Sequence, residues 1–474
     1  MDEKNELEQV KSRLFRDTKP GSVRVSAEVL ARADAYCDAY KAFLDEAKTE
    51  REAVFSAIRM AEQHGYRPFD PAATYAPGDR VYVNNRNKSI ILATFGKRSC
   101  AEGLHLAAAH IDSPRLDLKP NPLYEKNDLA FLDTHYYGGV KKYQWTTIPL
   151  ALHGRIVKTD GTAIDVRIGE QPGDPQFCVT DLLIHLSGEQ QSKTLGAAIE
   201  GENLDVLTGS RAYCGLEGSD AVKANVLALL HEQYGITETD FISADLTMVP
   251  AAHAVDIGLD RSMIGAYGHD DRVCAYTALT AEFAVTEPEF THVTVLTDRE
   301  EIGSEGNTGL QADYLRHFIE DLADQAHVPA RTVFRHMDCL SADVNAAFDP
   351  LYPAPYELRN TAVINGGVVV TKYTGARGKS GTSDAPAEFV GHVRAVLDGE
   401  SVLWQTGELG RVDGGGGGTV AKFIANMDVD VVDVGVPVLS MHAPMEVVSK
   451  LDVFMTTRAF EAFYRSGMME SFPV

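Results

Sequence analysis

Several apolar, strand-like runs in this chain end just before a histidine or a carboxylate, and this placement constrains the fold most. LHLAAA is followed by His110, HVTVLT leads to Glu300 and Glu301, and the run that contains CLSA precedes Asp343. A fourth run, VGVPVLS, is followed closely by His442. In open α/β sheets, ligands bind in the crevice beyond the carboxyl ends of the strands. The pattern therefore predicts that these side chains converge at one edge of a sheet.

The pattern of predicted secondary structure changes twice along the chain. After about residue 248, strand-like runs alternate with helical patterns, which is typical of an α/β sheet covered on both faces. Residues 118–247 instead carry many short β-like runs separated by turn residues. A chain of 474 residues also favours more than one domain. We therefore expect an α/β domain whose sheet is covered on both faces, split into residues 1–117 and 248–474, and an inserted β-rich domain at 118–247.

The composition excludes several classes of partner. The chain has 68 acidic and 44 basic residues and a formal net charge of −24, so it lacks the basic surface that nucleic acid or an anionic membrane requires. No run of about 18 apolar residues predicts a membrane-spanning helix. The six cysteines form no C-x-x-C pair. The charged N-terminus lacks the apolar stretch of a secretion signal, and a cytoplasmic address is expected.

The residues at the strand ends suit a pair of divalent metal ions. Asp270 precedes a helical pattern at 272–283 and adds a carboxylate to the group. Imidazole and carboxylate ligands bind zinc well, and cobalt and manganese accept them too. Two neighbouring metals need one shared carboxylate and a few private ligands each. Two histidines and three carboxylates meet that need, and the predicted ligands are His110, Asp270, Glu301, Asp343 and His442.

Two further carboxylates have predicted roles in catalysis. A hydrolase with a metal-activated water needs a group that takes the proton from the water and passes it to the leaving amine. Glu300, beside the ligand Glu301, is the natural candidate. Asp112 follows His110 by two residues, and in an extended chain such residues face the same side. Asp112 is therefore predicted to accept the second ring N–H of His110 and to fix its tautomer.

These residues lie in segments that resemble the aspartyl aminopeptidase and vacuolar aminopeptidase I family of metallopeptidases. The matching segments are AAAHIDSPRLDLKP, GHDDRVCAYTAL, DREEIGSEG, LSADVNAAFDP and SMHAPMEVVSKLD, which span residues 107–452 in the family's order. The resemblance implies the same five metal ligands with Asp270 bridging, Glu300 as general base and Asp112 as the group that orients His110.

The resemblance also implies a fold, an activity and an assembly. The fold is a zinc-peptidase-like α/β catalytic domain with a central mixed sheet flanked by helices, split in sequence by the inserted β-rich domain. Members of the family remove the N-terminal residue of peptides and form large homo-oligomers, often tetrahedral dodecamers, with the inserted β-rich domain serving dimerisation. In them, a histidine of an Ile-His-Leu segment reaches the active site of a neighbouring subunit. Ile184-His185-Leu186 is similar to that segment, which makes His185 a candidate substrate-binding residue. The alternative interpretation is that His185 is a buried or surface histidine of the β-rich domain with no role in substrate binding.

The chain departs from the aspartyl branch after Lys372. That branch has an Asn-Ala-Asn-Gln-Arg-Tyr run after a lysine, whereas Lys372 is followed by YTGARGKSGTSDA. Lys372 is a candidate for binding an acidic substrate side chain, and the altered flank leaves a broader specificity equally open. A two-metal deacylase or carboxypeptidase stays open as an alternative. A non-catalytic scaffold is a third, but the full ligand set together with Glu300 argues against it.

One glycine-rich segment, Gly414–Gly418, has no motif assignment. It lacks the spacing and the preceding strand of a dinucleotide-binding fingerprint. A flexible linker is one interpretation. We favour a loop at the active site, because the segment lies shortly before the run that leads to His442.

Overall fold

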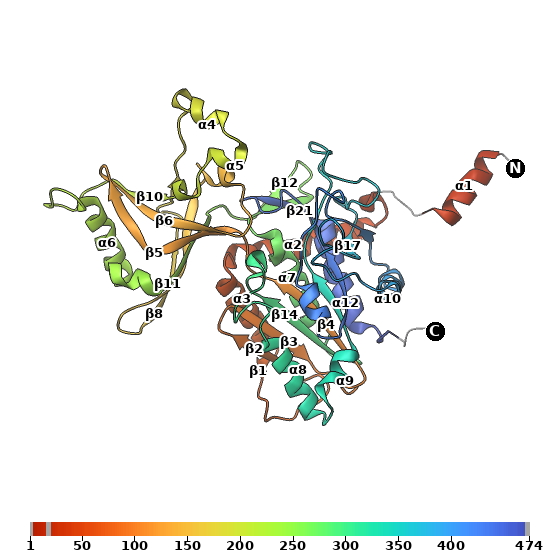
Figure 1. Ribbon diagram of the computed structural model, residues 1–474. Coiled ribbons are helices and arrows are strands. Elements are labelled where there is room, and N and C mark those ends of the chain that lie inside the picture. Colours follow the sequence, from red (N-terminus) through yellow and green to blue (C-terminus); the bar gives the residue numbers. More distant parts are fainter. Residues whose placement is uncertain (1–2, 16–19, 470–474) are drawn as a thin grey trace.

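A nine-stranded sheet forms the larger part of the computed structural model, which describes residues 3–15 and 20–469 (Figure 1). The central strands β14, β4, β15 and β19 pair in parallel, whereas β3 and β17 run antiparallel to their neighbours. The predicted α/β fold with a central mixed sheet is confirmed. In spatial order the strands are β1 (Arg67–Pro68), β2 (Arg80–Asn85), β3 (Ser89–Thr94), β14 (Thr291–Thr297), β4 (Leu104–His110), β15 (Met337–Ala342), β19 (Asp430–Gly435), β17 (Val368–Thr371) and β18 (Trp404–Thr406).

The central strands β4, β14 and β15 are buried along their whole length because helices cover both faces of the sheet. One face is covered by α2 (Ala27–Glu46), α3 (Glu50–Gln63), α7 (His269–Ala284), α10 (Ala387–Gly399) and α12 (Lys450–Arg465). The other is covered by α8 (Tyr314–Gln325), α9 (Ala330–Arg335) and α11 (Ala421–Ala425). Continuous apolar runs are what such a two-sided sheet requires.

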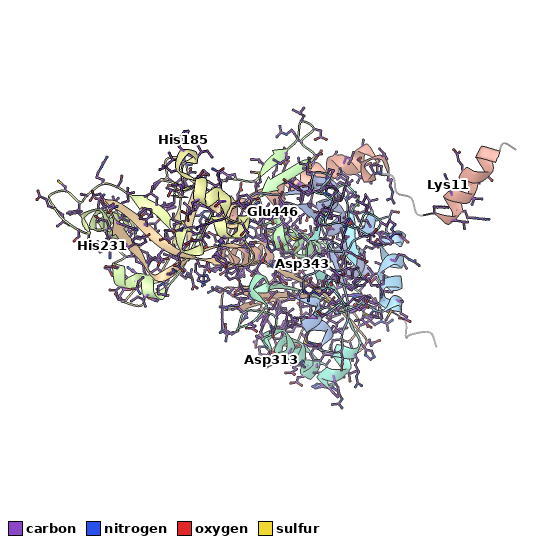
Figure 2. All side chains as sticks on the ribbon, turned by 45° about the horizontal axis from the view of Figure 1, so that its top comes forward. Lys11, His185, His231, Asp313, Asp343 and Glu446 are labelled. Carbon is purple, nitrogen blue, oxygen red and sulfur yellow. The ribbon has the colours of Figure 1, made fainter. Side chains whose placement is uncertain are left out.

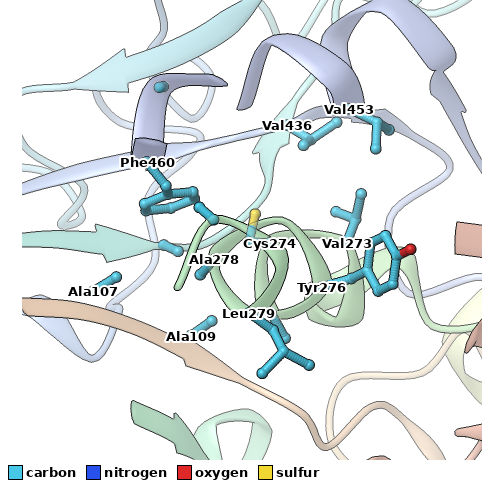
Figure 3. Packing of buried hydrophobic residues seen from close by; sticks show 14 of the residues in the cluster. Ala107, Ala109, Val273, Cys274, Tyr276, Ala278, Leu279, Val436, Val453 and Phe460 are labelled. Atoms are coloured by element: carbon cyan, nitrogen blue, oxygen red, sulfur yellow. The ribbon is translucent and has the colours of Figure 1, made fainter. Parts of the chain in front are cut away.

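Strand β4 shows how small side chains let α7 approach the sheet. Ala107 and Ala109 face the cluster that contains α7, whereas Leu106 and Ala108 face the opposite cluster, as the two-residue period of a strand requires. Figure 3 shows α7 crossing this strand, with Leu279 close to Ala109. The alanines leave room for the helix that carries Asp270.

Residues 26–65 contain two separate helices, α2 and α3. Thr49 begins α3, and its side chain accepts a hydrogen bond from the Glu52 backbone N–H at 3.2 Å. The Glu52 carboxylate in turn accepts from the Thr49 N–H at 3.0 Å. This reciprocal capping box satisfies two backbone donors at the helix start, and it separates α3 from α2.

A seven-stranded antiparallel sheet, covered by α6 (Ala221–Tyr234), stands to one side of the larger sheet (Figure 1). The helix α6 lies within the stretch that the sequence predicted to be β-rich. In spatial order the strands are β8 (Ala163–Ile168), β7 (Leu150–Val157), β11 (Ala244–Pro250), β5 (Arg115–Lys126), β6 (Leu129–Tyr137), β10 (Val206–Gly209) and β9 (Cys178–Val179). Short helices α4 (Gly188–Ser192) and α5 (Leu195–Ala198) lie between β9 and β10 in the chain.

A third, five-stranded sheet holds segments that lead to the candidate site. Its strands are β12 (Val255–Ile257), β13 (Met263–Ala266), β21 (Glu446–Ser449), β20 (Pro437–Leu439) and β16 (Asn345–Ala346). Strand β13 precedes α7, and the loop between β20 and β21 contains His442. The N-terminal helix α1 (Glu3–Leu14) lies apart from the rest in Figure 1. Within the described ranges, no helix is both long and apolar enough to cross a membrane.

Candidate metal centre

The parallel register brings the predicted ligands to one edge of the central sheet. His110 is the last residue of β4, and its Cα partner on β14 is Thr297, so the two strands end level with each other. Glu301 follows β14 in a short 3-10 helix, η6 (Glu300–Ile302), and Asp343 follows β15. Asp270 enters from the first turn of α7. The side chains thus meet because neighbouring parallel strands end at the same edge.

The five predicted ligands form two groups that share Asp270. Ligand atoms of His110, Asp270 and Asp343 all lie within 4.8 Å of one another, and so do those of Asp270, Glu301 and His442. The two oxygens of Asp270 face different groups: Oδ1 lies 3.1 Å from His110 Nε2, and Oδ2 lies 3.1 Å from His442 Nε2. Glu301 Oε1 lies 3.5 Å from His442 Nε2.

These separations fit a tetrahedral metal environment. Two ligand atoms bound to zinc at about 2.0–2.1 Å lie roughly 3.3 Å apart in a tetrahedron. The donors are imidazole nitrogens and carboxylate oxygens, which suit zinc. In addition, Glu301 Oε1 is buried and accepts no hydrogen bond from any described residue. A buried acceptor of this kind needs a partner, and a cation between the groups would be one.

The electrostatics of the site also favour cations. Burial, followed by the neighbouring Asp270 carboxylate, raises the pKa of Glu301 well above its usual value. Burial and then Glu300 raise the pKa of Asp343 in the same way. Burial opposes the charge of Asp270 too, but hydrogen bonds with His110 and His442 hold its pKa below the usual range. Carboxylates crowded into a dry site must be neutralised, by protons or by metal ions.

Glu300 lies at the edge of this group. Its Oε2 lies 3.9 Å from His110 Nε2, and it lines the same cavity as the ligand residues. Burial raises the pKa of Glu300 to about 7, an effect that the nearby positive charge of His110 reduces. A carboxylate with a pKa near the working pH can both accept and release a proton.

Asp112 organises the site more widely than the sequence predicted. Its backbone carbonyl lies 3.0 Å from His110 Nδ1, and its Oδ1 lies 3.3 Å from the same nitrogen. Its carboxylate also accepts hydrogen bonds from the backbone N–H groups of Glu300, at 3.1 Å, and Glu301, at 3.2 Å. The hydroxyl of Tyr137 donates to Asp112 Oδ2 at 2.7 Å. One side chain therefore fixes the strand-β4 ligand and the loop that carries Glu300.

Glu446 is a positioning residue that the sequence reasoning missed. Its carboxylate is buried and accepts from the backbone N–H of Asp270 at 3.0 Å and from that of His442 at 2.7 Å. It thereby holds together two ligands that are far apart in the chain. The signal was present in SMHAPMEVVSKLD, where this glutamate is the charged residue that opens the otherwise apolar EVVS strand.

The seven-stranded sheet also contributes to the centre. Tyr137 ends β6, and the chain that follows brings Gly139 against His442, whose Nδ1–H donates to the Gly139 carbonyl at 2.8 Å. A Cβ on Gly139 would lie 3.2 Å from His442 Nδ1, and one on Gly138 would lie 3.2 Å from Glu301 Oε2. These glycines allow the backbone to pass close to two candidate ligands.

A cavity of about 500 Å³ opens onto the candidate ligands and contains part of the glycine-rich segment. Gly416, Gly417 and Gly418 line it, in agreement with the favoured interpretation of a loop at the active site. Gly416 has a φ of 114°, and a Cβ there would lie 2.3 Å from the Gly375 carbonyl oxygen. The position therefore requires glycine.

The two tentative substrate-binding residues do not line this cavity. Lys372 Nζ pairs with Asp384 Oδ1 at 3.0 Å, and among the described residues the lysine that lines the cavity is Lys422. His185 lies in the 3-10 helix η3 (Ile184–Leu186) and is exposed. Figure 2 shows it well apart from Asp343.

Comparison with known proteins decides the family. The family described as aminopeptidase I zinc metalloprotease (M18) matches residues 43–464. The chain belongs to the M18 family of zinc aminopeptidases. A probable M18 family aminopeptidase 1 of Clostridium acetobutylicum is 46% identical over 458 residues, which cover 95% of this chain and 98% of the relative.

The solved structures of M18 aminopeptidases agree with this assignment. The enzyme of Thermotoga maritima has a TM-score of 0.91 at 43% identity and covers 95% of this chain and 99% of its own. The mApe1 dodecamer of S. cerevisiae has a TM-score of 0.72 at 18% identity, covering 90% of this chain and 95% of its own, and this likeness shows the fold alone. The M18 assignment makes this protein a metal-dependent peptidase and removes the scaffold alternative.

Proposed function

We propose that this M18 aminopeptidase cleaves the N-terminal residue of peptides with two divalent ions, which share Asp270 as a bridging ligand. His110 and Asp343 would complete one site, and Glu301 and His442 the other. The observation that carries the proposal is that the two oxygens of Asp270 face two separate histidines, each at 3.1 Å. Zinc suits these ligands and is named by the family description, while cobalt and manganese are also compatible.

Glu300 is the proposed proton carrier. When bound, the ions would supply a Lewis acid for the peptide carbonyl and lower the pKa of water. Glu300 then accepts a proton from the attacking water on a carboxylate oxygen and delivers it to the amine nitrogen that leaves. Its Oε2 lies 3.9 Å from His110 Nε2, so this carboxylate stands beside the proposed metal site, where such a proton transfer takes place. Asp112 would keep the ring of His110 and the backbone of Glu300 in place through the hydrogen bonds described above.

The decisive experiment separates catalysis from metal binding. Glu300→Gln should retain two ions per subunit by elemental analysis and lose about 10²- to 10⁴-fold in kcat on an aminoacyl chromogenic substrate. Asp270→Ala should instead lose bound metal, because it removes the shared ligand. Glu287→Gln, at an exposed glutamate, serves as the matched control. A near-normal rate for Glu300→Gln would rule out this residue as the base.

We further propose that residues 118–247 form a dimerisation domain, inserted into a catalytic domain of residues 1–117 and 248–474, and that the protein assembles into a homo-oligomer. Leu183, Ile184 and Leu186 surround His185 and are 53%, 68% and 68% exposed. Such a contiguous exposed apolar segment is typical of an interface. Yeast mApe1, which shares the fold, is itself a dodecamer. His185 would then approach the cavity of a neighbouring subunit.

Sedimentation velocity and kinetics test the assembly together. Ile184→Glu should shift the protein to smaller species, whereas Leu351→Glu, at a residue that is 80% exposed on the other part of the chain, should not. His185→Ala should keep the assembly and lower kcat/KM. An unchanged kcat/KM in an intact assembly would remove His185 from the site.

A further inference from the structure

The cavity at the metal centre contains a lysine that is left without an ionic partner. Lys422 lines the cavity beside Gly416–Gly418 and is half-buried. Its Nζ lies 4.7 Å from the centroid of the Phe423 ring, which lines the same cavity. Among the side chains of residues 8–15 and 20–469, no carboxylate lies within 4.0 Å of this ammonium. By contrast, Lys372 and Lys379 both pair with Asp384, at 3.0 and 2.6 Å.

The backbone under Lys422 is held firmly. Val420, Ala421 and Ile424 are buried in the core beneath the sheet, and they anchor α11 on both sides of the lysine. Thr419, which precedes Val420, donates a hydrogen bond from its hydroxyl to Asp433 Oδ1 at 2.8 Å. Because its neighbours face the core, the Lys422 side chain is directed to the cavity rather than packed into the fold.

The charge balance of the cavity makes this lysine important. Four carboxylates line it, from Asp270, Glu300, Glu301 and Asp343. Two divalent ions would carry four positive charges, which these carboxylates balance. The ammonium of Lys422 would then be the uncompensated charge in a partly desolvated space, where an opposite charge is attracted more strongly than in water.

We propose that Lys422 binds a carboxylate of the peptide substrate and thereby sets the substrate preference of this enzyme. This inference rests on the proposed aminopeptidase function. The carboxylate can come from an acidic side chain on the first residue or from the C-terminus of a short peptide, since both present the same anion. Apolar lining from Val344, Leu409 and Met441 receives the aliphatic part of the substrate.

The test compares substrate pairs that differ by one carboxylate. The first pair is the glutamyl and glutaminyl 4-nitroanilides, and the second is the dipeptide Leu-Gly and its C-terminal amide. Lys422→Met keeps the aliphatic stem and removes the charge. Since one charged hydrogen bond is worth about 1.5–3 kcal/mol, we expect kcat/KM to fall about tenfold or more for the carboxylate-bearing member of one pair. The neutral member should stay within about twofold. The pair that responds identifies the source of the carboxylate.

Charge reversal and two further variants complete the design. Lys422→Glu should raise kcat/KM for the lysyl 4-nitroanilide relative to the glutamyl one. Lys97→Met removes the same charge at an exposed position and should leave every ratio unchanged. The inference is overturned if Lys422→Met changes neither ratio, or if Lys372→Met changes them instead. Failure of the wild-type enzyme to cleave any free-amine substrate with metal bound would count against the proposed function itself.

Discussion

Replacing Glu446 by glutamine tests whether its carboxylate, which contacts the backbone of two candidate ligands, keeps those ligands in place. The carboxylate of Glu446 accepts one hydrogen bond from the backbone of Asp270 and one from the backbone of His442. Glutamine has nearly the same shape, but its amide has one acceptor oxygen and one donor NH₂. In either orientation, one backbone N–H would face the NH₂ group and lose its partner.

The size of the effect follows from these two contacts. Leaving a buried backbone donor unpaired costs about 1–3 kcal/mol. We therefore expect the free energy of unfolding of the metal-free protein to fall by about 1–3 kcal/mol. Because Asp270 and His442 would no longer be fixed, metal affinity should fall about 10- to 100-fold, as it does when outer-sphere partners of ligands are changed.

Competition with a chelator measures the affinity, and urea unfolding of the apo-protein measures the stability. Glu287→Gln, an exposed change of the same chemistry, should alter neither value. A purely structural role for Glu446 predicts lower stability with unchanged metal affinity. That outcome would refute the reasoning, because it would show that the ligands keep their places without this carboxylate.

Further predictions concern metal removal, the core and pH. Chelation should abolish turnover and lower the melting temperature, and metal return should restore both; each ion at 100 times its dissociation constant would add about 2.7 kcal/mol. Glu282 is buried and accepts hydrogen bonds from Tyr66, Thr94, Thr294 and His292, so Glu282→Ala should cost about 3–5 kcal/mol in urea unfolding. Burial lowers the pKa of His105, but Asp338, whose Oδ1 lies 2.6 Å from its Nδ1, raises it more, and the net pKa lies above the ordinary value. The stability that this pair contributes is complete below about pH 6.5 and is lost as pH rises through the raised pKa. The difference in unfolding free energy between wild type and His105→Gln should therefore be larger at about pH 6 than at about pH 9, and an equal difference at both would contradict this assignment.

The central sheet could be predicted from sequence because its signal is local. An apolar run such as LHLAAA encodes a strand buried on both faces, and the residue after the run must then lie at the sheet edge. His110 and Asp343 follow from this rule without any knowledge of long-range contacts. The helix α6 was missed for the opposite reason, since AVKANVLALLHEQY is apolar around much of its surface and lacks a clear amphipathic period.

Side chains whose roles depend on distant partners could not be predicted in this way. Lys372 stays a candidate for substrate binding, and its ion pair with Asp384, twelve residues away, is a contact that the sequence pattern did not indicate. Lys422 had no motif, and its importance comes from the cavity that the glycine segment and the metal ligands form around it. Which carboxylate pairs with a given lysine depends on tertiary contacts, and the periodicity of the sequence gives no information about those contacts.

The contacts of Tyr137 and Gly139 argue that the seven-stranded sheet is part of the catalytic machinery as well as a candidate interface. The Tyr137 hydroxyl binds the same Asp112 carboxylate that holds the Glu300 backbone, and the guanidinium of Arg115 lies 4.0 Å from the Tyr137 ring centroid. The Gly139 carbonyl fixes the ring of His442. Excising residues 118–247 would remove both contacts, leaving His442 without its outer partner and Asp112, which orients His110, without the Tyr137 hydroxyl. A catalytic part expressed alone should therefore bind metal weakly even where it folds, because the geometry of the centre depends on chain that the catalytic sheet does not contain.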